Sequence, residues 1–164
     1  MKKNKKNNQG QLIIESSIAL TILIIGFLAI VTLLTHSLAA NQNSVNRLIA
    51  AHLAEEGIEV VKNIIDTNSA ENRAWNEGLT TGKHEVAYNS NSLESYQGRF
   101  LYLNKNSGFY NYNPAGVRTT FTRTIEIFNI SSDEIKVKAT VTWTTRNLAS
   151  TISVEDHFFN WRKP

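Results

Sequence analysis

The side chains that most often do chemistry in proteins stand at no catalytic or metal-binding spacing along this chain. Its four histidines are scattered, with no two at the spacing of metal ligands: His36, His52, His84 and His157. The HExxH motif, the GxSxG motif and a glycine-rich phosphate loop are all absent from the sequence. Glu155, Asp156 and His157 are consecutive in a predicted strand, where side chains alternate between faces, so they cannot converge on one site. We expect no enzyme activity, no catalytic residue, no metal and no cofactor.

Composition excludes further kinds of site and partner. The 164 residues include no cysteine, which rules out disulfides, thiolate metal sites and a cysteine nucleophile. The formal net charge is +3, but four lysines precede Gly10, so the remainder carries +3 − 4 = −1. A basic cluster beside an apolar segment is a membrane topology signal rather than a phosphate-binding surface. We therefore expect no direct binding of nucleic acid, and an N-terminus that stays in the cytoplasm.

One carboxylate, Glu15, stands in an apolar segment that extends from residue 12 to about residue 40. Residues 16–35 contain no ionisable side chain, and a helix of that length is about as long as the hydrocarbon core of a bilayer is thick. An ionisable group at the bilayer centre costs about 2.5–3.5 kcal/mol and normally marks a function or a partner. One turn from the helix start, the carboxyl could instead extend to the lipid headgroups. Its position alone leaves both interpretations open.

The N-terminal segment could be processed in three different ways. An ordinary signal peptide would be cut near Ser37-Leu38-Ala39, but its apolar region is longer than the usual length of about 7 to 15 residues. An uncleaved signal anchor would hold an outward-facing domain and would give Glu15 no role. Cleavage before the apolar helix would give both Gly10 and Glu15 a role.

Cleavage before the apolar helix is typical of a known family of signal sequences. A short lysine-rich leader that ends in Gly10, followed by Gln11, three apolar residues, Glu15 and a long apolar helix, resembles the class III signal of the type IV prepilin family. The resemblance implies that a prepilin peptidase cuts between Gly10 and Gln11 on the cytoplasmic side. Glu15 would then be the fifth residue of the mature chain. Gln11 stands where many members carry an N-methylated phenylalanine, which leaves methylation open.

The resemblance also implies a set of partners. The apolar helix would leave the lipid for the core of a filament, where Glu15 would neutralise the new terminal amine of a neighbouring subunit. The implied partners are the prepilin peptidase, other pilin subunits, a pilus assembly platform and, before assembly, the membrane.

Beyond the apolar segment, residues 41–66 continue as a predicted amphipathic helix. Apolar residues recur there at steps of three and four: Val45, Leu48, Ile49, Leu53, Ile58, Val61, Ile64 and Ile65. The stretch AEEGIEVVKNIID, residues 54–66, resembles minor pilins of the PilV-like, or pilus modification, kind. A solvated face is the alternative interpretation of its glutamates. Gly57 in mid-helix predicts a close approach by a sheet or by a neighbouring subunit.

The rest of the chain is predicted to be a small antiparallel sheet. Residues 67–117 are rich in loops, with two or three short strands near residues 85–88, 100–103 and 109–112. Residues 118–164 form a predicted meander, in which EIKVKATVTW alternates strictly between apolar and polar positions. A single apolar sheet face needs a cover, and the amphipathic helix is available.

These patterns predict an α+β fold of the type IV pilin kind, with a long N-terminal helix packed on a small C-terminal antiparallel sheet. The expected segments are a leader (1–10), a transmembrane or filament-core helix (11–40), an amphipathic helix (41–66), the loop-rich region (67–117) and the meander (118–164). The expected function is that of a minor pilin or pseudopilin-like subunit, first in the inner (cytoplasmic) membrane and then in a cell-surface filament. A pilus, a secretion pseudopilus, a competence system and an adhesive role all stay open. The alternative is an uncleaved, membrane-anchored binding domain that does not polymerise.

Overall fold

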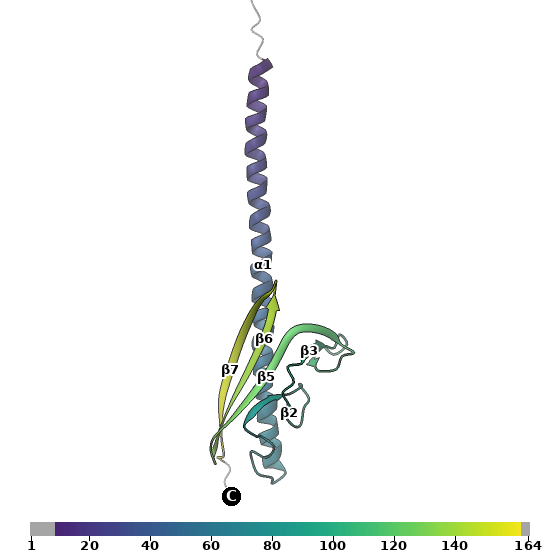
Figure 1. The fold of residues 1–164 in the computed structure, drawn as a ribbon, viewed down its shortest axis with the longest axis vertical. Coiled ribbons are helices and arrows are strands. Elements are labelled where there is room, and N and C mark those ends of the chain that lie inside the picture. Colours follow the sequence, from purple (N-terminus) through teal and green to yellow (C-terminus); the bar gives the residue numbers. More distant parts are fainter. Residues whose placement is uncertain (1–8, 162–164) are drawn as a thin grey trace, which may run out of the picture. The chain divides into compact units, whose positions relative to one another are not determined.

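The computed structural model describes residues 9–161 and has the predicted α+β class: one long helix followed by an antiparallel sheet (Figure 1). The helix is α1 (Gln9–Ala70). The strands are β1 (Gly82–Glu85), β2 (Glu94–Ser95), β3 (Phe100–Leu103), β4 (Tyr110–Asn111), β5 (Val117–Ser131), β6 (Glu134–Thr145) and β7 (Leu148–Phe159). The predicted leader, residues 1–10, lies outside the described residues except for its last two.

The chain divides into two compact units, Met1–Asn43 and Ser44–Pro164. In the described part of the first unit, α1 is one helix whose large apolar side chains are exposed from Leu12 to Leu38. This segment is long and apolar enough to cross a membrane, by length and composition. The unit therefore has no core of its own among its described residues, and its apolar surface needs a lipid or protein environment.

In the second unit, one face of α1 contributes to a hydrophobic core shared with the sheet. Its buried apolar residues follow a helical spacing: Ala50, Leu53, Ala54, Ile58, Val60, Val61, Ile64 and Ile65. Val45 and Leu48, which the sequence pattern assigned to the same apolar stripe, are exposed. The actual stripe includes Ala50 and Ala54, because small side chains let the helix approach the sheet closely.

The predicted meander of three long strands is confirmed. β5 pairs with β6 and β6 with β7, all antiparallel, and the β6–β7 register continues without a shift from Glu134↔Phe159 to Thr145↔Leu148. On β6 the inward side chains are the predicted ones, all buried: Ile135, Val137, Ala139, Val141 and Trp143. The strict alternation of apolar and polar residues therefore predicted the buried face of β6 correctly.

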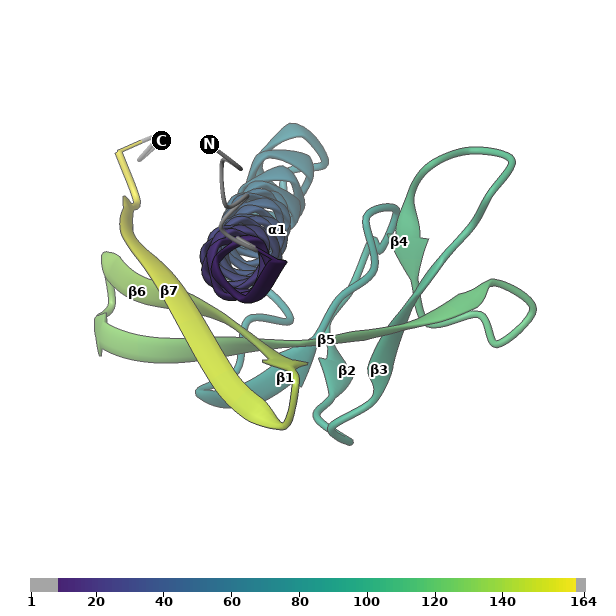
Figure 2. The same cartoon turned by 90° about the horizontal axis from the view of Figure 1, so that it is seen from above.

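The short strands extend the sheet on the other side of β5. Its second half pairs with β1, with Ile127 opposite Gly82, and its first half pairs with β3, with Val117 opposite Leu103. β2 and β4 are the outermost strands on this side. Figure 2 shows the sheet curling around the part of α1 that belongs to the same unit. The helix thus covers the apolar face, while the opposite face carries charges such as Glu126 between Lys83 and Lys138.

Several predicted boundaries differ by a few residues. The helix continues to Ala70 instead of ending near residue 66, and four short strands occur where two or three were expected. The strand expected over residues 85–88 lies at Gly82–Glu85, and the one expected over residues 109–112 is limited to Tyr110–Asn111. These strands are set by pairing with β5 and β3, which local sequence does not encode.

Candidate functional site in the N-terminal segment of the helix

The predicted processing site lies in the first turn of α1. Helix α1 begins at Gln9, so Gly10 and Gln11 are both helical, and both are exposed. The first four N–H groups of a helix have no partner within it, so this turn can open at low cost to a peptidase. A Cβ atom built on Gly10 would meet nothing within 4 Å. The described part of the chain therefore gives no packing reason for glycine at this position.

Glu15 lies on the same helix face as Gln11, one turn further along. A shallow hollow on this face is lined by Gln11, Ile14, Glu15, Ile18, Ala19 and Ile22. These positions follow the steps of three and four that place residues on one side of a helix. The structure thus brings the predicted assembly residue, Glu15, next to the residue that would become the new N-terminus, Gln11.

Other polar side chains of the apolar segment bond to the helix itself. The hydroxyls of Ser16, Thr21 and Thr32 donate to backbone carbonyls three or four residues earlier, at 3.0, 2.8 and 2.8 Å. Such bonds satisfy a hydroxyl without any partner from outside the helix. Glu15 differs, because its carboxylate makes no hydrogen bond or ion pair with a residue of the described range 9–161. In an apolar environment, the charge of Glu15 therefore needs a partner from outside this segment.

The chemistry open to this segment is charge pairing. A carboxylate and an ammonium about 4 Å apart interact by about 4 kcal/mol at an effective dielectric constant near 20, before the cost of desolvation. The net stability of a buried pair can be close to zero, since both charges leave water. An unpaired buried charge is nevertheless penalised, so such a pair selects one stagger between neighbouring helices over others.

The second unit contains two buried charges that the sequence did not single out. Arg123 on β5 is fully buried and donates to the carbonyls of Leu53 and Val86, at 2.9 and 2.6 Å, and to Glu56 Oε1 at 2.8 Å. Its position in β5 is in phase with the inward residues Phe121 and Ile125. This alternation along β5 is the sequence signal that could have identified Arg123 as an inward-facing charge. Arg123 ties helix, sheet and the segment after β1 together.

Glu85 is the second buried charge, and it organises a loop. Its carboxylate accepts from the backbone N–H groups of Gln97 and Arg99, at 3.1 and 2.9 Å, and from the Arg99 guanidinium Nε at 2.5 Å. Arg99 also bonds Glu94 and lies 4.4 Å from the ring centroid of Tyr112. This cluster fixes the connection between β1 and β3, and no periodic pattern in the sequence indicates it.

No side-chain cluster in residues 9–161 suits a metal ion, because no group of three or more histidine, aspartate or glutamate residues converges there. No family model, curated protein or solved structure matches the chain. The function is therefore argued from the sequence and the geometry alone.

Proposed function

We propose that this protein is a structural subunit of a type IV pilus-like filament, a minor pilin or a pseudopilin-like protein. A prepilin peptidase cuts it between Gly10 and Gln11, and the apolar half of α1 then carries it into the filament. The observation that supports this most strongly is Glu15, a carboxylate without a partner among residues 9–161, one turn from Gln11 on an exposed apolar helix face.

The proposal gives each unusual feature a physical reason. Cleavage creates an amine at Gln11, and an amine at a helix N-terminus within an apolar environment needs a counter-ion. The apolar helix is exposed along its length, so it fits lipid before assembly and other helices afterwards. Gly10 has no packing role in the described residues, so a requirement for glycine would come from the peptidase.

The test compares three chains, wild type, Glu15→Ala and Glu15→Gln, in cells that assemble the filament. Both variants should insert in the membrane and be cleaved, but their incorporation into sheared filaments should fall by about tenfold or more, which corresponds to about 1.4 kcal/mol per contact. Glu15→Gln removes the negative charge but keeps the shape of the side chain, so it tests the charge alone. Incorporation equal to wild type in both variants would overturn the pairing role of Glu15.

The alternative is a membrane-anchored binding domain that never polymerises. It is favoured by the second unit, which has its own core and surface clefts. Such a protein would keep an uncut N-terminus and would not appear in filament fractions.

A further inference from the structure

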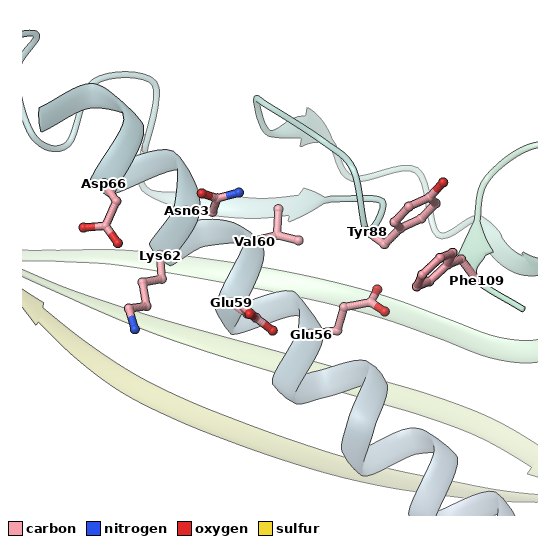
Figure 3. A pocket seen from close by; sticks show the side chains of 8 residues that line it. All are labelled: Glu56, Glu59, Val60, Lys62, Asn63, Asp66, Tyr88 and Phe109. Carbon is pink, nitrogen blue, oxygen red and sulfur yellow. The ribbon is translucent and has the colours of Figure 1, made fainter. Parts of the chain in front are cut away.

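A cleft of about 520 Å³ lies in the second unit between α1 and two loops of the sheet (Figure 3). The helix contributes Glu56, Glu59 and Val60 to its lining, and the opposite wall consists of Tyr88 and Phe109. In Figure 3, the Glu56 and Val60 side chains extend from the helix towards the two aromatic rings. The cleft therefore combines carboxylates with an aromatic wall.

The aromatic wall is a stacked pair from two distant parts of the chain. Tyr88 follows β1 and Phe109 precedes β4, and their ring centroids are 4.5 Å apart at an interplanar angle of 11°. Despite this stacking, Tyr88 is 36% and Phe109 48% exposed. Exposed aromatic rings in a concave site are the usual anchors of a binding surface.

The charge of the cleft favours a cation. Three carboxylates line it, from Glu56, Glu59 and Asp66, against the one ammonium of Lys62. The buried Arg123 already pairs with Glu56. Glu59 makes no ion pair within residues 9–161, although Lys62 is one turn away.

In the same unit two guanidiniums, and the ammonium of Lys136 at 4.8 Å from the Phe128 centroid, lie over aromatic rings. The Arg99 guanidinium bonds two carboxylates and lies over the Tyr112 ring, and the Arg118 guanidinium lies 4.1 Å from the Phe100 centroid. A planar guanidinium can stack on a ring and bond a carboxylate at once, which an ammonium does less well. The cleft offers a ring pair and carboxylates, but no cation of the described residues lies over Tyr88 or Phe109.

We propose that this cleft binds an exposed arginine side chain of another polypeptide. The guanidinium stacks on the Tyr88–Phe109 pair and faces the carboxylates of Glu56 and Glu59, while its alkyl chain contacts Val60. The site serves recognition of a partner and is independent of the helix-mediated assembly proposed above. We take the ligand to be an arginine side chain because the ring pair and the carboxylates of the lining are complementary to a guanidinium.

The test uses the full-length chain in detergent micelles, titrated with the peptide acetyl-Gly-Gly-Arg-Gly-Gly-amide. The peptide should shift the Val60 methyl NMR signals saturably, and added salt should weaken its binding, because exposed charges are screened. The same peptide with citrulline in place of arginine keeps the shape without the charge and should produce no saturable shift. Absence of a shift with the arginine peptide would overturn the proposal.

Variants localise the binding. Phe109→Ala and Glu56→Gln should each weaken peptide binding by roughly fivefold, since each removes one of the two attractions. Glu56→Gln retains an oxygen that can accept from Arg123, so the fold should persist, and a melting curve checks this. Tyr96→Ala and Glu155→Gln, an exposed tyrosine and an exposed glutamate outside the cleft, are the matched controls and should leave binding unchanged.

Two outcomes would contradict the assignment. Equal weakening by the control variants would mean that the peptide binds by non-specific charge attraction. Saturable Val60 shifts with maltotriose, but none with the arginine peptide, would identify a saccharide site instead. Neither outcome bears on filament assembly, because the assay is made on the isolated subunit.

Discussion

At the scale of single residues, the ionisation of the buried Tyr112 phenol is linked to folding. Burial raises its pKa to about 12, with the charge of Glu85 adding to the effect and those of Arg123 and Arg99 opposing it. Its hydroxyl is buried and has no hydrogen-bond partner within the described residues. The neutral phenol is therefore the form that the fold accommodates, at the cost of an unsatisfied polar group.

This ionisation predicts a loss of stability at high pH. An unfolded tyrosine has a pKa near 10, so between about pH 10 and pH 12 the unfolded state releases its proton while the folded state retains it. The free energy of unfolding should therefore fall as the pH rises through this window. The difference in tyrosine absorbance between wild type and Tyr112→Phe should titrate with a midpoint at about pH 12.

The stability of Tyr112→Phe at pH 7 checks whether the hydroxyl of Tyr112 has a partner. It removes a buried hydroxyl without a partner, so the variant should be as stable as wild type or more stable at pH 7. It should also lose less stability than wild type between pH 10 and pH 12. A strongly destabilised Tyr112→Phe at pH 7 would mean that the hydroxyl has a partner, such as a buried water, that the fold depends on.

At the scale of the elements, Gly57 sets how closely α1 approaches the sheet. A Cβ atom at this position would lie 2.6 Å from Ile125 Cδ1 and 3.2 Å from Arg123 Cδ. This confirms the close approach that a glycine in mid-helix predicted, and it assigns the sheet of the same unit as the approaching element. The glycine thus costs helix propensity, about 1 kcal/mol against alanine, in exchange for close packing.

Gly57→Ala should lower the free energy of unfolding by about 1–2 kcal/mol, because overpacking outweighs the gain in helix propensity. The measurement is urea unfolding followed by the fluorescence of the buried Trp143. Ile125→Val removes the clashing Cδ1 atom and should cost about 0.5–1.5 kcal/mol alone. The double variant should lose clearly less than the sum of the two single changes, and simple additivity would contradict a direct clash.

The elements that the sequence predicted well are those with a strong local period. The alternation in β6 and the spacing of apolar residues in α1 depend only on which face each side chain occupies. The division of one edge of β5 between β1 and β3 could not be predicted, because it depends on pairing across the chain. The buried charge at position 123 was also missed, because the partners of Arg123 lie far away in the sequence, on α1 and in the segment after β1.

At the scale of the whole molecule, the two units have opposite surfaces. The described part of the first exposes apolar side chains and one carboxylate, whereas the second buries a core and exposes charged and hydroxyl side chains. An exposed apolar surface of this extent is not stable in water without lipid or a partner. The candidate processing residues, Gly10 and Gln11, and the candidate assembly residue, Glu15, could be proposed from the sequence because they lie within one segment. The cleft of the second unit was not, since Tyr88 and Phe109 meet only in the folded sheet.

The central claim is that the chain is cut between Gly10 and Gln11 and retains its apolar helix. The most direct test is the intact mass and N-terminal sequence of the membrane-fraction protein, expressed with and without a prepilin peptidase. We expect a peptidase-dependent N-terminus at Gln11, and an uncut chain for Gly10→Ala, which should leave the helix content unchanged. An N-terminus that is identical with and without the peptidase, whether uncut or near Ala40, would contradict the account.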